Sequence, residues 1–207
     1  MTNSQESFWK NQIESEYALD NSKFDLDLGC RAWQSMLKSI DLNSITTFLD
    51  CGSNVGRNVG FLNKVIPDAS ANIIELASKP FASCTSSFKI EKSFLGAIKD
   101  ASFDARFDLV FSCGVLIHVN PDDLLRSMER MYDLSDRYIL IAEYFNRTPI
   151  SIDYRGSSDK LFKLDFGKLF LENFKCITVD YGFLWGFEYE PAGFDDVTFW
   201  LFEKSGE

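Results

Sequence analysis

The sequence predicts one α/β domain, a three-layer sandwich in which helices cover both faces of a mostly parallel seven-stranded sheet. Three observations predict it. Apolar runs typical of strands alternate along the chain with segments whose apolar residues recur at helical spacing. Strands that alternate with helices form right-handed βαβ units and a parallel sheet buried on both faces. The last two apolar runs have no helix between them, which indicates a carboxyl-terminal antiparallel hairpin at the sheet edge.

Expected helices and expected strands alternate along most of the chain. Asn120 is expected to cap a long amphipathic helix that has Pro121 at its first position. The stretch 146–156 is polar and contains Pro149 and Gly156, so we expect an irregular loop there. The expected helices span 4–21, 28–42, 56–67, 78–88, 120–134 and 157–174. The expected strands span 44–50, 70–76, 91–98, 106–115, 136–145, 175–185 and 196–204.

Composition narrows the class of partner. The chain has 207 residues, 45% of them hydrophobic, which is enough for one buried core and short for two. Its formal net charge is -10, so it lacks the basic surface that supplies most nucleic-acid affinity. A small neutral or cationic ligand suits this balance better than a polyanion.

The cysteines and the amino terminus indicate the compartment. The five cysteines are far apart and form no C-x-x-C pair, so we expect reduced thiols and no bound metal. No basic region followed by an apolar run begins the chain, and no apolar segment is long enough to span a bilayer. We expect a soluble cytoplasmic protein with no membrane partner, either a monomer or a homodimer.

The segment 46–58, TTFLDCGSNVGRN, carries the first chemical signal. Ligands of such sheets bind where the first strand turns into the first helix. Here the spacing is D-x-G-x-N-x-G, from Asp50 through Gly52 and Asn54 to Gly56, and it matches neither a dinucleotide loop nor a phosphate loop. An acid before the glycines would repel phosphate and attract a cationic amino-acid tail, which points to S-adenosylmethionine. The alternative is a turn that needs glycine for conformation alone.

Glu75 strengthens this interpretation. It ends the next expected strand, a little over twenty residues after the loop, where an acid commonly holds a ribose hydroxyl pair. A carboxylate suits this task because it accepts two hydrogen bonds at once. The alternative for Glu75 is a solvated cap of the following helix.

Two sets of motifs resemble known families. FLDCGSNVGRN with Glu75, and FDLVFSCGVLIHVNPDDL, resemble the class I S-adenosylmethionine-dependent methyltransferases, which implies a Rossmann-like sandwich over 1–207 with helices of 1–43 covering the cofactor site of a core over 44–207. GVLIHVNP, AEYFNRTPISIDYRGSSDKLFKLDF and VDYGFLW…DDVTFWLFEK are similar to the pseudaminic acid biosynthesis-associated methylase family. That family implies a sugar or sugar-acid acceptor from nonulosonic acid or surface glycan synthesis. Asn54 departs from the class I pattern, which more often has glycine there.

The resemblance assigns the cofactor site residue by residue. The expected cofactor is S-adenosyl-L-methionine. The implied contacts are Asp50, Gly52, Asn54, Gly56, Arg57, Cys113 and Gly114 around the methionine part, Glu75 at the ribose, Ala97 and Ile98 at the adenine, and Tyr17 closing over the site.

The acceptor side has fewer signals. His118 is the only histidine and follows an expected strand, so it is either a general base or a residue that orients its loop. Tyr154 and Arg155 are the other catalytic candidates. Arg155 could hold a carboxylate or phosphate of the acceptor. The alternative role for Arg155 is a surface ion pair.

The aromatic residues near the carboxyl terminus allow two interpretations. They either form the wall of the acceptor pocket, which we favour, or pack on the sheet edge. The set comprises Phe183, Trp185, Phe187 and Tyr189.

Three functional hypotheses follow from the sequence. The first is a methyltransferase acting on a small sugar or sugar acid. The second is a methyltransferase acting on another small acid, an amine or a protein side chain. The third is a protein that binds S-adenosylmethionine without turnover.

Overall fold

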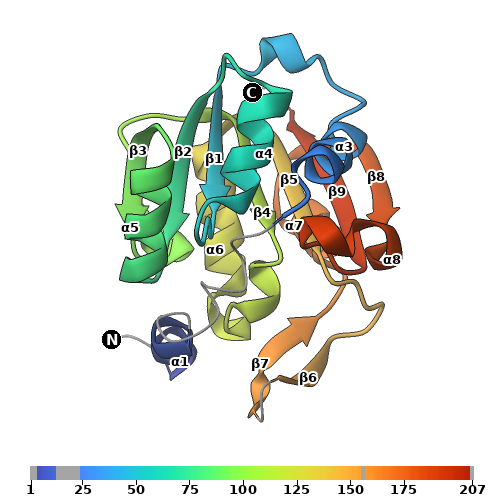
Figure 1. Cartoon of the computed structure of the whole chain (residues 1–207). Coiled ribbons are helices and arrows are strands. Elements are labelled where there is room, and N and C mark those ends of the chain that lie inside the picture. The colour runs from blue at the N-terminus through green and yellow to red at the C-terminus, as the bar shows by residue number, and fades with distance from the viewer. Residues whose placement is uncertain (1–3, 13–23, 155–156, 206–207) are drawn as a thin grey trace.

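The computed structural model describes residues 4–12, 24–154 and 157–205 and has the predicted three-layer architecture (Figure 1). The main sheet has seven strands in the order β3-β2-β1-β4-β5-β9-β8. The first five are mutually parallel, whereas β9 runs antiparallel to β5 and to β8. The strands are β1 Thr47–Cys51, β2 Ser70–Glu75, β3 Ile90–Leu95, β4 Phe107–Cys113, β5 Ser135–Glu143, β8 Cys176–Leu184 and β9 Val197–Lys204. The α/β class and the carboxyl-terminal hairpin are therefore confirmed.

Helices cover the sheet on both faces. Buried side chains of α3 and α4 pack with Cys84 of α5 against one face, and those of α6 and α7 pack against the other. Neighbouring residues of one strand serve opposite layers, as Phe48 and Leu49 do, which follows from the two-residue repeat of a strand. The helices are α1 Ser4–Gln12, α3 Leu26–Met36, α4 Arg57–Val65, α5 Ser78–Ser87, α6 Pro121–Leu134, α7 Phe166–Asn173 and α8 Gly186–Tyr189. Short 3-10 turns are η2 Leu42–Ser44, η3 Ile98–Asp100, η4 Leu116–His118 and η5 Glu190–Ala192.

The start of α6 is as predicted. The Asn120 side chain accepts a hydrogen bond from the Asp122 backbone N–H, and Pro121 occupies the first turn, where its missing N–H costs nothing. The helix expected over 28–42 ends at Met36, and the 3-10 turn η2 begins at Leu42, the last residue of the expected helix.

The prediction for 146–174 was wrong in its first half. Strands β6 (Ile150–Tyr154) and β7 (Ser157–Lys163) form a separate antiparallel pair, and α7 begins only at Phe166. The side chain of Asp165 accepts from the Lys168 backbone N–H and so fixes the helix start at Phe166, nine residues later than the apolar spacing suggested.

The elements outside the main sandwich, α1 and the β6–β7 pair, lie at one end of the sheet. The carboxyl ends of the parallel strands point towards α1 and the β6–β7 pair, which both lie beyond that edge (Figure 1). Among the described residues, no helix has the length and apolar character needed to cross a membrane.

Candidate active site

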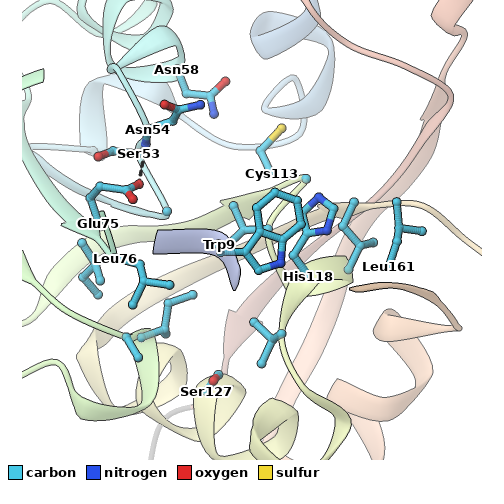
Figure 2. A pocket seen from close by; sticks show the side chains of 18 of the residues that line it. Trp9, Ser53, Asn54, Asn58, Glu75, Leu76, Cys113, His118, Ser127 and Leu161 are labelled. Carbon is cyan, nitrogen blue, oxygen red and sulfur yellow. Dashed lines mark hydrogen bonds between the residues drawn. The ribbon is translucent and has the colours of Figure 1, made fainter. Parts of the chain in front are cut away.

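A cavity of about 460 Å³ opens at the carboxyl ends of the parallel strands. The loops after β1, β2, β3 and β4 form its wall, together with residues of α1, β7 and the segment before β9. In Figure 2, Trp9 lies beside His118, and Glu75 lies on the other side of the view with its carboxylate towards Asn54. The cavity volume falls within the range of about 300–1,000 Å³ that is typical of small-molecule sites.

The loop after β1 owes its shape to left-handed residues. Gly52 has φ 97° and Gly56 has φ 90°, and Asn54 has φ 48°. Asparagine is one of the few non-glycine residues that adopt this region readily. Asn54 therefore departs from the class I motif in sequence, but it adopts a left-handed conformation that glycine would also allow.

Glu75 lies where the loop interpretation placed it, at the end of β2 and on the cavity wall. Its side chain is only 3% exposed, and its two oxygens accept from the backbone N–H groups of Asn54 (2.7 Å) and Ala77 (2.8 Å). Burial raises its pKa, and these hydrogen bonds offset part of that effect. Each carboxylate oxygen keeps a further lone pair that a ligand hydroxyl can use.

Asp50 and Gly56 do not line the cavity, contrary to the expectation that both meet the ligand. Asp50 is fully buried within β1, and burial raises its pKa to about 8, although the nearby Arg57 lowers it. A Cβ at Gly56 would lie 2.7 Å from the ring of Phe88 and 2.8 Å from the sulfur of Cys84. Gly56 is therefore needed for the turn and for packing on α5, and Asp50 makes no direct contact with the cavity.

Several buried oxygens near this loop have no partner. Both carboxylate oxygens of Asp50 and the side-chain carbonyl oxygens of Asn54 and Asn58 make no hydrogen bond among the described residues. Asn54 and Asn58 lie on the cavity wall. Unpaired buried polar groups are rare and costly, so a ligand that donates hydrogen bonds fits this part of the cavity. Asn58 was not singled out from the sequence.

The remaining expected cofactor contacts gather around the same space. Gly52, Arg57, Ala97, Ile98, Cys113 and Gly114 all lie on the cavity wall. Arg57 donates to the carbonyl oxygen of Gly193 and lies over the rings of Phe24 (5.4 Å) and Phe194 (5.0 Å), so its guanidinium is held in place.

His118 ends the 3-10 turn η4 and lies on the cavity wall. Its Nδ1 is 3.1 Å from the carbonyl oxygen of Lys160. Because a carbonyl can only accept, Nδ1 carries the hydrogen and Nε2 carries the lone pair. Burial lowers the pKa of His118 to about 4, so the ring is neutral at physiological pH.

Helix α1 supplies wall residues that the sequence did not reveal. The indole of Trp9 lies 4.0 Å from the His118 ring between centroids, and the side-chain amide of Gln5 donates to the His118 carbonyl oxygen (2.6 Å). Lys99 joins Glu6 of this helix (2.6 Å) to Asp123 of α6 (2.7 Å). The contacts of α1 join it to residues about a hundred positions further along the chain, and no local sequence pattern signals them.

The structure does not place every expected site residue. Tyr17 and Arg155 lie outside the described residues, and Tyr154 is described only as the last residue of β6. The expectation that the aromatic residues wall the acceptor pocket was wrong for those that point outward from β8 and α8: Phe183 is 57% exposed, Trp185 55% and Phe187 82%. Tyr189 instead packs against the core beneath α3. Within the described ranges, no three His, Cys, Asp or Glu side chains converge on a point that could hold a metal ion.

Comparison with known proteins supports the fold. No family model matches the sequence, and no curated protein matches it. Solved structures do match the structure of this chain. Magnesium protoporphyrin IX methyltransferase from Synechocystis, with bound S-adenosylmethionine, is 9% identical over 98% of both chains with a TM-score of 0.71.

Two further structures give the same result. The N-methyltransferase NodS from Bradyrhizobium japonicum, in complex with S-adenosylhomocysteine, is 12% identical over 99% of this chain and 100% of the other, with a TM-score of 0.70. A 1,6-didemethyltoxoflavin-N1-methyltransferase from Burkholderia thailandensis is 14% identical over 97% and 87% of the two chains, also with a TM-score of 0.70. The chain therefore has the Rossmann-like fold of S-adenosylmethionine-dependent methyltransferases.

Proposed function

We propose that the protein is an S-adenosyl-L-methionine-dependent methyltransferase that acts on a small molecule. The observation that carries the proposal is that one cavity is lined both by the loop and acid expected for the cofactor, Gly52 to Arg57 with Glu75, and by the neutral ring of His118. Solved methyltransferases of the same fold hold S-adenosylmethionine or its demethylated product, which supports this choice of cofactor.

The chemistry of the wall fits this cofactor. Asn54 and Asn58 present buried, unpaired carbonyl oxygens, which are acceptors that an ammonium group can satisfy. Glu75 would hold the ribose hydroxyls, and Ala97 with Ile98 would lie against the adenine. Asp50 is buried behind this loop, and because burial raises its pKa to about 8 its carboxyl is largely neutral at physiological pH; a bound ammonium group would favour its ionised form.

Methyl transfer needs alignment and a dry site more than it needs acid–base chemistry. When bound, S-adenosylmethionine supplies an electrophilic methyl group on a sulfonium sulfur. Trp9 covers one side of His118 and limits the access of water to it. For a hydroxyl or amine acceptor, Nε2 of His118 takes the proton that the acceptor loses when its oxygen or nitrogen bonds to the methyl carbon.

For the acceptor, we propose a sugar or sugar-acid intermediate of nonulosonic acid or surface glycan synthesis. The motifs between Gly114 and Lys204, which are similar to the pseudaminic acid biosynthesis-associated methylases, support it. Another small acid, an amine or a protein side chain is the alternative acceptor. Cytoplasmic location is part of the same proposal, and the five free cysteines, which suit a reducing compartment, support it.

The test is transfer of a labelled methyl group from S-adenosylmethionine to a panel of acceptors. The panel contains nonulosonic sugars and their precursors, simple carboxylates, primary amines and peptides. We expect label in a sugar or sugar acid, with the rate reduced in His118→Gln and unchanged in the distant surface variant Lys89→Gln. Label in another acceptor would replace the acceptor proposal, and binding of the cofactor with no transfer to any acceptor would favour the non-catalytic binding protein.

A further inference from the structure

A buried acid that the sequence analysis did not single out lies under the turn that carries His118. Glu143 is the last residue of β5, and its side chain is 0% exposed. One carboxylate oxygen accepts from the hydroxyl of Ser112 (2.9 Å) and from the backbone N–H groups of Val115 (3.1 Å) and Leu116 (2.9 Å). The other oxygen faces the backbone N–H of Ile117 at 3.4 Å. Three successive N–H groups thus converge on one carboxylate.

These donors belong to the start of η4. The first N–H groups of a helical turn have no partner within the turn. Leu116 and Ile117 are each 1% exposed, so water cannot serve their N–H groups. Removing the carboxylate would leave buried donors unpaired, which is costly enough to move the turn.

The same strand end fixes the other side of the turn. Gly114 has φ 67°, and its N–H donates to the carbonyl oxygen of Ala142, next to Glu143 (2.9 Å). The end of β5 therefore holds in place both the chain reversal at Gly114 and the turn that follows it. His118 is tied to this turn by its own N–H, which donates to the carbonyl oxygen of Val115 (2.9 Å).

Under the proposed function, this turn carries residues of both the cofactor side and the acceptor side of the cavity. Cys113, Gly114, Val115, Ile117 and His118 all lie on the cavity wall, whereas Glu143 does not. Val115 also contacts the cofactor loop, because a Cβ on Gly52 would come within 2.6 Å of its methyl groups. A displacement of the turn would change the place of His118 relative to the acceptor.

We propose that Glu143 is a positioning residue for methyl transfer, which acts by fixing the Val115–His118 turn and with it the ring of His118. The proposal rests on the proposed function for its kinetic consequence. Its structural consequence stands independently, since the place of the His118 ring can be measured without turnover.

The experiment compares Glu143→Gln with Asp108→Asn. The glutamine keeps the length of the side chain but replaces one acceptor oxygen by an NH₂ group that would face the buried donors. Asp108 is a matched control because its carboxylate also accepts from two successive backbone N–H groups, those of Thr46 (2.8 Å) and Thr47 (2.9 Å), at the opposite end of the sheet. Both variants lose a carboxylate that organises backbone, and only one of them lies under the cavity turn.

The first readout is the nuclear magnetic resonance titration of the imidazole, which is unambiguous because the chain has one histidine. We expect the pKa of His118 to rise from about 4 towards its ordinary value in Glu143→Gln, because a displaced ring is better solvated, and to stay unchanged in Asp108→Asn. Unchanged titration in Glu143→Gln would overturn the proposal, whether or not the protein proves to be a methyltransferase.

The second readout is kinetic. With an acceptor in hand, we expect Glu143→Gln to lower kcat about tenfold or more at saturating acceptor while affinity for S-adenosylhomocysteine changes less than about threefold. Glu143→Asp, which keeps the carboxylate one methylene shorter, should recover part of kcat. Equal losses of kcat in Glu143→Gln and Asp108→Asn would show that Glu143 contributes to the stability of the fold and does not position His118. If Glu143→Gln does not fold, the same titration of Glu143→Asp decides, because its shorter side chain must also shift the His118 signal.

Discussion

The buried, neutral state of His118 makes the stability of the protein depend on pH in a predictable way. The perturbation is His118→Gln, which keeps a polar side chain of similar reach and removes the titration. In the folded protein burial lowers the pKa of His118 to about 4 from an ordinary 6.5. Between these values the unfolded chain binds a proton that the folded protein does not, so stability rises with pH there and falls on acidification.

The magnitude follows from these two pKa values. Linkage gives a loss of up to about 2 kcal/mol of unfolding free energy as pH falls from about 7.5 to about 5, since each pKa unit corresponds to about 1.4 kcal/mol. Buried acids such as Glu143, whose pKa is raised to about 7, contribute in the opposite direction. They are present in both proteins, so their contributions cancel when the wild type and His118→Gln are compared.

Urea denaturation at the two pH values measures the effect. We expect the wild type to lose up to about 2 kcal/mol more than His118→Gln on going to the lower pH. Parallel behaviour of the two proteins would show that His118 titrates like a solvated histidine. The buried state of the ring would then be contradicted, and with it the tautomer that the Lys160 carbonyl selects.

Three further predictions concern the cavity wall. Gly52→Ala should weaken S-adenosylhomocysteine binding about tenfold in calorimetry and lower the melting temperature, because φ 97° is strained for alanine and its Cβ would meet Val115 at 2.6 Å; unaltered affinity would contradict the loop assignment. Glu75→Gln should cost about tenfold or more in the same assay, since a hydrogen bond to a charged group contributes about 1.5–3 kcal/mol; a variant that binds like the wild type would remove the ribose role. Trp9→Ala should raise the pKa of His118 and the KM for the acceptor while sparing the cofactor affinity. A change in cofactor affinity alone would assign Trp9 to the cofactor part of the cavity instead.

The sheet and its ligand edge could be predicted because their signals are local. The strands β1, β2, β4 and β5 contain short apolar runs, β3 alternates apolar with polar residues, and Asn120 with Pro121 marks the start of α6. Glu75 could be found because its distance along the chain from the loop is set by the length of one helix and one strand. Its place on the cavity wall follows from parallel pairing of β1 with β2.

The sequence failed where a feature depends on distant contacts. Trp9 reads as one apolar position of a helix, and only packing against His118, over a hundred residues away, places it at the site. Strand β7 was missed because Leu161 and Phe162 continue the apolar spacing of α7, while pairing with β6 makes them extended. Asp50 carried the right residue type, but its place within β1 buries it behind the cavity wall.

The central claim is that the cavity recognises a nucleoside with a cationic amino-acid tail and no phosphate. Isothermal titration calorimetry of the wild-type protein with S-adenosylhomocysteine tests it most directly, with ATP and NADH as phosphate-bearing comparators. We expect one site per chain with micromolar affinity for S-adenosylhomocysteine and no heat with either comparator. Folded protein that takes up ATP or NADH and not S-adenosylhomocysteine would contradict the account.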